Sequence, residues 1–251
     1  MLFLHQSNLV NFFDCPYKFL QSLEHKLEQT DAMRYGLLFE GYALGFKEDK
    51  DKYALEGRLG DKKLKVIKSH AELMKSVAPE IFTKGCEYYK KLSWEESKDI
   101  TMVGETDIID LENATIYDLK YTSDIDRIWG KKKNRNEFLQ ASYYPYMVNK
   151  IFGVKCKFIY ILVENKFDNP IVQKITRIPQ EEDYEYVEQT LSAVKEFMSR
   201  KEALIYEIEK DKCLGKWPNE WKCNFLEHCS KARNEIYKDK TLLYEEEEGV
   251  I

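Results

Sequence analysis

TMVGETDIIDLENATIYDLKYT, residues 101–122, is the stretch that decides the fold. Its β-branched and apolar residues predict one strand over 101–111 and a second over 115–122, with a short polar turn between them. Such a turn makes the two strands antiparallel neighbours. With the turn centred on its polar residues, Asp107 and Asp118 fall roughly opposite each other, which places both carboxylates within reach of one ion.

Two carboxylates at that separation repel each other strongly unless a cation lies between them. Oxygen ligands in a chain with only four histidines favour Mg²⁺ or Mn²⁺ over zinc. Lys120 shares a strand face with Asp118, because side chains alternate along a strand and Leu119 lies between them. A bound metal activates a water and stabilises charge on a phosphate oxygen, and a lysine beside it orients that water or neutralises the developing charge. This chemistry suits hydrolysis of a phosphodiester bond.

The spacing of Asp118 and Lys120 carries little weight by itself. An acid two residues before a lysine also occurs at Glu96 and Lys98, where a solvated strand face is the ordinary interpretation. The pairing with the strand of Asp107 is what favours a site here.

The rest of the chain predicts an α/β (α+β) fold with a central mixed sheet flanked by helices. Residues 47–66 predict a hairpin or an exposed loop, and 155–165 and 170–178 predict two further strands. Apolar periodicity predicts helices over 7–24 (kinked or divided at Pro16), 35–46, 67–92, 136–151 and 180–210.

Composition narrows the class of protein. The 251-residue chain has a formal net charge of −5, so bulk positive charge does not attract nucleic acid and any basic surface must be local. The start has no basic leader or cleavage-type residues, and no run approaches the roughly 18 apolar residues of a spanning helix. We therefore expect a cytoplasmic protein, whose six cysteines serve as ligands or buried thiols rather than as structural disulfides.

Four motifs together resemble the PD-(D/E)XK nuclease superfamily, in its RecB-like branch. The resemblance covers residues 7–229, and its specificity lies in the order of the motifs rather than in any one of them. The motifs are Gly36-Leu-Leu-Phe-Glu40, Gly104-Glu-Thr-Asp107, Asp118-Leu-Lys120 and the QxxxY-like Gln140-Ala-Ser-Tyr-Tyr144.

The resemblance implies that Glu40 binds the catalytic metal together with Asp107 and Asp118. Many relatives have histidine at the position of Glu40. Without the resemblance, an acid inside this apolar stretch has two interpretations, a cation ligand or the polar edge of a helix.

Gln140 and Tyr144 lie one turn apart on the predicted helix and so share a face. The resemblance implies that this pair approaches the substrate and the catalytic Lys120. Two alternatives stay open, namely a plain surface pair, or Tyr143 as the relevant ring.

The cysteines extend the resemblance to the iron–sulfur nucleases of the branch, in which one N-terminal cysteine joins three near the C-terminus. It implies that Cys15, Cys213, Cys223 and Cys229 hold a [4Fe–4S] cluster, with structural Zn²⁺ as the alternative for four thiolates. The spacing departs from the commoner pattern, because Glu220 stands where relatives have a cysteine. Cys86 and Cys156 lie outside this set, and we expect both to be plain buried residues.

A basic segment between Lys120 and the QxxxY helix is the candidate DNA contact. It can contact phosphates and stack a base, although charged loops are often simply solvated. Its candidate residues are Arg127, Trp129, Lys131, Lys132, Lys133 and Arg135.

These observations predict one nuclease domain over residues 1–251. Its core spans 36–200, segments 1–30 and 205–235 form a cysteine-cluster lobe joined by the metal cluster, and 240–251 is an acidic tail. The expected activity is Mg²⁺- or Mn²⁺-dependent hydrolysis of DNA, and the resemblance implies an exonuclease acting on single-stranded ends. The alternatives are an endonuclease of the same fold and a non-catalytic nucleic-acid-binding module.

Overall fold

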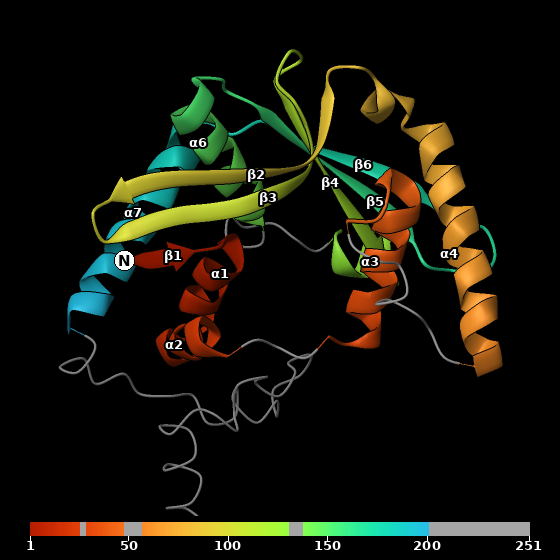
Figure 1. Cartoon of the computed structure of the whole chain (residues 1–251), viewed down its shortest axis with the longest axis horizontal. Coiled ribbons are helices and arrows are strands. Elements are labelled where there is room, and N and C mark those ends of the chain that lie inside the picture. Colours follow the sequence, from red (N-terminus) through yellow and green to blue (C-terminus); the bar gives the residue numbers. More distant parts are fainter. Residues whose placement is uncertain (26–28, 48–56, 131–137, 201–251) are drawn as a thin grey trace, which may run out of the picture. The chain divides into compact units, whose positions relative to one another are not determined.

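A computed structural model describes residues 1–25, 29–47, 57–130 and 138–200 of the chain (Figure 1). The chain divides into two compact units, 1–6 with 29–189 and 7–28 with 190–251. The first unit contains the sheet and all the candidate metal-binding carboxylates.

The first unit is built on a six-stranded mixed sheet of order β1-β3-β4-β5-β6, with β2 paired to β3. The pairs β1·β3 and β4·β5 are parallel and the other three are antiparallel. A central mixed sheet in an α/β fold confirms the predicted fold class. The strands are β1 (Leu2–Leu4), β2 (Cys86–Ser97), β3 (Ile100–Asp110), β4 (Thr115–Thr122), β5 (Lys157–Glu164) and β6 (Val172–Arg177).

Strand β3 uses its two edges differently. Along one edge it pairs with β2 over most of its length, whereas the other edge is shared by β1 at 100–102 and β4 at 108–110. Among the described strands, residues 103–107 therefore have no ladder partner along that second edge. Figure 1 shows β3 and β4 diverging from the point where their pairing ends.

Helices cover both faces of this sheet. Against one face, α3 (Asp31–Leu44) and α4 (Gly57–Val77) bury a cluster that includes Leu119 and Ile161. Against the other lies α6 (Gln140–Phe152), whose Tyr144 ring stacks on Phe158 of β5. Side chains alternate between the two faces along a strand. Leu119 therefore lies on the side of α3 and α4, and its neighbours Asp118 and Lys120 lie on the side of α6. The remaining short helices of this unit are η2 (Pro79–Phe82) and α5 (Ile125–Ile128).

The described part of the second unit consists of α1 (Gln6–Asp14, from Ser7 onward), α2 (Pro16–Glu24) and the end of α7 (Glu181–Arg200). An edge-to-face aromatic group of Phe12, Phe19 and Phe197 joins them, with ring centroids 5.5–6.3 Å apart. Pro16 begins α2, so the predicted division of the 7–24 helix at this proline is confirmed.

Two sequence-based boundaries were wrong. Residues 57–66, predicted as part of a hairpin or loop, form the first half of α4, while 48–56 lie outside the described residues. Residues 86–92, predicted as helix, belong to strand β2, so Cys86 lies in a strand. Strand β2 escaped detection because its buried residues do not alternate regularly. Within the described ranges, no helix combines the length and apolarity needed to cross a membrane.

Candidate functional site

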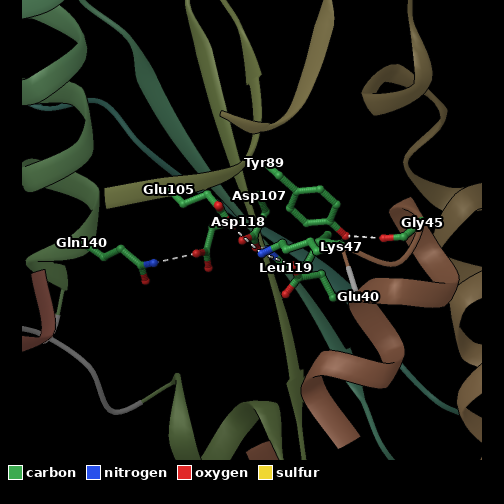
Figure 2. Close-up of polar contacts among 9 residues, drawn as sticks. All are labelled: Glu40, Gly45, Lys47, Tyr89, Glu105, Asp107, Asp118, Leu119 and Gln140. Atoms are coloured by element: carbon green, nitrogen blue, oxygen red, sulfur yellow. Dashed lines mark hydrogen bonds and ion pairs between the residues drawn. The ribbon is translucent and has the colours of Figure 1, made fainter. Parts of the chain in front are cut away.

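The site lies where the β3–β4 ladder stops. Paired residues run from Asp110↔Thr115 to Ile108↔Tyr117, and the next position in this register sets Asp107 opposite Asp118, as predicted. There the strand-to-strand bonds end, and Asp107 Oδ2 instead accepts the backbone N–H of Leu119 at 2.8 Å. A side-chain carboxylate thus takes over a position that a backbone carbonyl fills elsewhere in a ladder (Figure 2).

Asp118 is held from two sides. Lys120 Nζ lies 2.6 Å from its Oδ2, and Gln140 Nε2 of α6 donates to its Oδ1 at 2.6 Å (Figure 2 shows the Gln140 contact). The Asp118 side chain is 6% exposed and that of Lys120 is 35% exposed. Gln140 therefore fixes the carboxylate, while Lys120 keeps access to solvent.

The second residue of the QxxxY motif, Tyr144, packs against the glycine of the second motif. A Cβ added to Gly104 would lie 2.7 Å from Tyr144 Cε1, so only glycine leaves room for this ring. Tyr143, the alternative ring, is fully buried and donates its hydroxyl to the carbonyls of Leu4 and Val103 at 2.6 and 3.0 Å. The structure thus places Tyr144 against Gly104, near enough to Asp118 and Asp107 for their charges to raise the pKa of its hydroxyl. Tyr143 instead closes the open edge of β3.

Glu40 projects from α3 toward the same centre, where its charge repels that of Asp107. Its direct partner is Lys47, a residue outside the four motifs. Lys47 Nζ lies 3.1 Å from Glu40 Oε1 and 2.6 Å from Oε1 of Glu105, the residue between Gly104 and Thr106. Figure 2 shows this amine between the two carboxylates.

Tyr89 of β2 completes the surroundings of Lys47. Its ring centroid lies 4.1 Å from Lys47 Nζ, and its hydroxyl donates to the carbonyl of Gly45 at 2.7 Å. The Tyr89 backbone has φ +56°, in the left-handed region that non-glycine residues rarely adopt. Neither Lys47 nor Tyr89 belongs to any of the four motifs. Of the residues around this amine, Glu105 had a sequence signal, because it is the glutamate of Gly104-Glu-Thr-Asp107.

The charged groups of this centre change one another's pKa values. Burial raises the pKa of Asp118 to about 7, with Asp107 adding repulsion and Lys120 opposing the rise. Burial likewise raises the pKa values of Asp107 and Glu40. Burial opposes the charge of Lys120, but the two aspartates outweigh it and raise the pKa of this amine. Protons are therefore bound more tightly here than at ordinary surface carboxylates.

The donor chemistry fits a hard divalent ion. The three carboxylates supply oxygen ligands, and Asp118 Oδ2 is buried with the charge of Lys120 nearby but no hydrogen bond of acceptable geometry. As they stand, however, the described residues contain no group of three or more acids, histidines or cysteines spaced to enclose an ion. Metal binding by these carboxylates is therefore a proposal. The amines of Lys47 and Lys120 lie among them.

The predicted DNA segment is only partly described. Arg127 is exposed, with its side chain 68% accessible. Trp129 is 7% exposed and packs on Tyr160 with centroids 4.9 Å apart, so the expectation that it stacks on a base is corrected to a core role. Trp129 follows the buried Ile125 by one helical turn and lies on the same apolar face, which explains why its ring is buried. Lys131, Lys132, Lys133 and Arg135 lie outside the described residues.

Of the predicted cluster ligands, only Cys15 is described. It is a half-buried free thiol at the start of α2, and Cys213, Cys223 and Cys229 lie outside the described residues. Cys156 is buried, as expected, whereas Cys86 is only half-buried. The cysteine cluster remains a prediction.

Comparisons with known proteins agree with this fold. Residues 6–215 match a family described as "PDDEXK-like domain of unknown function (DUF3799)". The crystal structure of a "Putative exonuclease" from Eubacterium rectale is 17% identical, covers 79% of each chain and has a TM-score of 0.55, which shows a shared fold. The structure of SSO0001, 14% identical over 76% of each chain, has a TM-score of 0.35 and supports no argument. No curated protein matches the chain.

Proposed function

The chain belongs to this family of PDDEXK-like domains, and on that premise we propose that it is a cytoplasmic deoxyribonuclease dependent on Mg²⁺ or Mn²⁺. The observation that carries the proposal is the ladder end, where Asp107 and Asp118 meet and Lys120 lies on Asp118. Paired carboxylates beside a partly exposed lysine are suited to hydrolysis of a phosphodiester bond.

Each residue has a distinct role in the proposed reaction. Asp107, Asp118 and Glu40 would hold the divalent ion, which when bound supplies an activated water and neutralises phosphate charge. Gln140 keeps Asp118 oriented through its 2.6 Å bond, so the carboxylate cannot turn away when substrate enters. Lys120 Nζ donates to the attacking water or to the phosphate oxygen on which charge develops.

Tyr144 is a positioning residue in this proposal. Its ring fills the space above Gly104, and burial raises the pKa of its hydroxyl to about 12, which keeps this group a neutral hydrogen-bond donor. A neutral hydroxyl near Asp118 and Asp107 adds no negative charge to theirs. Arg127 supplies an exposed positive charge for a backbone phosphate.

We propose single-stranded DNA ends as the substrate. Support comes from the sequence resemblance, and the structural neighbour from Eubacterium rectale is itself named a putative exonuclease. DNA labelled at its 5′ or 3′ end and incubated with Mg²⁺ or Mn²⁺ should lose label progressively. A covalently closed single-stranded circle should survive an exonuclease and be cut by an endonuclease, and binding without any cleavage would favour the non-catalytic module.

Lys120→Ala is the decisive variant in this assay. Its matched control is Lys98→Ala, because Glu96 and Lys98 have the same spacing as Asp118 and Lys120 but lie beside the start of β3, where Ser97 pairs with Ile100, away from Asp107. Lys98 is exposed in the turn after β2. The proposed site is wrong if Lys120→Ala degrades DNA as fast as the parent protein.

We also propose a [4Fe–4S] cluster on Cys15, Cys213, Cys223 and Cys229, with Zn²⁺ as the alternative. Protein purified without oxygen should be brown and contain iron and sulfide. Cys15→Ala should lose the colour, whereas Cys156→Ala, at a buried cysteine outside the set, should keep it. Colourless protein with one equivalent of zinc would decide for the alternative.

A further inference from the structure

Lys47 occupies an unusual position for a lysine near a catalytic centre. Its amine lies 3.1 Å from Glu40 and 2.6 Å from Glu105, with the Tyr89 ring at 4.1 Å. Its side chain is 33% exposed, and those of Glu40 and Glu105 are 16% and 30% exposed. Both carboxylates are thus more enclosed than in an ordinary surface ion pair, so the amine replaces solvent that they lose.

The chain adopts two uncommon backbone conformations to place this amine. Gly45, which ends α3, has φ +104°, and Tyr89 has φ +56°. The Tyr89 hydroxyl then ties the Gly45 carbonyl to β2, two residues before Lys47. A strained non-glycine residue persists only where its surroundings over-determine it, and such residues gather at functional sites.

The position of its amine indicates what Lys47 does. Lys47 Nζ contacts Glu40 and Glu105, whereas Lys120 Nζ contacts Asp118. Lys47 thus covers, with a positive charge, the side of the centre that Glu40 and Glu105 form, which is where a second cation would otherwise bind.

We infer that Lys47 stands in for a second metal ion, so that this centre binds one divalent cation rather than two. Lys47 is thus a positioning residue that neutralises Glu105 and one side of Glu40, leaving Asp107, Asp118 and the rest of Glu40 for the ion. The inference rests on the proposed metal dependence but says more, because a nuclease with two ions would also satisfy the proposed function.

The alternative role for Lys47, direct contact with a substrate phosphate, fits its contacts less well. Its amine already has an acceptor on each of two sides and an aromatic face on a third. Leaving them for a phosphate would expose two enclosed carboxylates to a third negative group. Lys120, with one carboxylate partner and the same degree of exposure, is better placed for that contact.

The test is the number of Mn²⁺ ions bound per chain in the absence of DNA, measured by titration with detection of free Mn²⁺ by electron paramagnetic resonance. The full-length protein should bind one. Lys47→Met and Lys47→Gln should each bind two, because the uncovered carboxylates take a second ion. Lys47→Arg keeps the charge and should bind one.

The double variant Lys47→Met/Glu105→Gln is the matched control. It removes both partners of the 2.6 Å pair and so restores the charge balance, and we expect one bound ion again. A merely structural role for Lys47 would not be rescued in this way. Thermal melts identify any variant that does not fold, and the two neutral substitutions give independent routes to the same result.

Two bound ions in the parent protein, or one in both neutral single variants, would overturn the inference while leaving the proposed nuclease function intact. No Mn²⁺ bound to any variant would instead refute the metal dependence itself. The inference and the proposed function therefore fail through different measurements.

Discussion

The hairpin of β3 and β4 has two halves with opposite chemistry. Near the turn, Ile109 and Ile116 face each other across a regular ladder, and both are buried. Beyond Tyr117 the ladder gives way to the Asp107 carboxylate and Leu119 N–H, and acids and lysines replace the aliphatic residues. The paired half thus gains its stability from burial and backbone bonds, whereas the open half leaves polar groups poorly compensated and so able to bind a ligand.

The largest expected effect is a loss of nuclease activity when the open half of the hairpin is changed. Asp107→Asn in the open half should reduce cleavage of single-stranded DNA by a factor on the order of 10³, because a carboxylate that holds the ion is lost. The carbonyl oxygen of Asn still accepts the Leu119 N–H, so the fold is retained. A folded variant with full activity would contradict the division.

The paired half should respond through stability instead. Ile109→Ala removes a fully buried side chain beside the turn and should lower the free energy of unfolding by about 3 kcal/mol. Well below its melting temperature the variant should cleave DNA at the parent rate. Chemical denaturation and a rate measurement at low temperature check both statements, and a large loss of rate in fully folded protein would show that the halves are coupled.

The sequence predicted these two halves unequally. The paired half follows from local rules, alternating apolar residues around a polar turn, so its strands and register were predicted. In the open half, Asp107, Asp118 and Lys120 were predicted because the register sets them together. Lys47 and Tyr89 were not, because they reach the centre from a helix end and a strand through left-handed backbone at Gly45 and Tyr89.

A single sequence does not show tertiary packing, and this also explains why the predictions for Trp129 and for the start of α4 were wrong. Proximity to lysines suggests a surface role for Trp129, but its ring buries a large apolar area by packing on Tyr160. The first turns of α4 contain two glycines and many lysines, which obscure the apolar stripe formed by residues such as Leu64 and Ile67. Packing against α3 decided the conformation there, and a single sequence does not show that packing.

A third prediction concerns the effect of pH on the two halves. The pKa of Asp118 is raised by burial to about 7, so this group favours folding only while protonated, and that contribution is lost as the pH rises from the unfolded value of 3.8 through about 7. Asp118→Asn, which mimics the protonated acid, should stabilise the metal-free protein by about 2 kcal/mol near pH 8. The gain should shrink toward zero near pH 4, in thermal melts with a chelator present.

Asp110 in the paired half is the control, with the opposite sign. Burial opposes its charge, but the N–H groups of Asn113 donate to it at 2.8 and 3.0 Å and lower its pKa. Its contribution to stability is present above the unfolded value and lost as the pH falls, so Asp110→Asn should destabilise the protein near neutral pH. Two substitutions with the same sign would mean that the halves do not differ electrostatically.

The smallest expected effect tests whether the open edge of β3 is shaped for Tyr144. Gly104→Ala would put a methyl group 2.7 Å from Tyr144 Cε1, so the ring must shift, at a cost of about 1 kcal/mol in unfolding free energy. In a Tyr144→Leu background that ring is absent and the cost should disappear, giving a coupling of about 1 kcal/mol in a double-mutant cycle. Gly36→Ala is the matched control, because a methyl group there meets nothing within 4 Å and the residue lies inside α3. Since alanine suits a helix interior better than glycine, that substitution should stabilise the protein by about 0.5 kcal/mol. If Gly104→Ala is as harmless as Gly36→Ala, the ring is not held against β3 and Tyr144 loses its positioning role; if the cost persists without the ring, the strain lies in the β3 backbone.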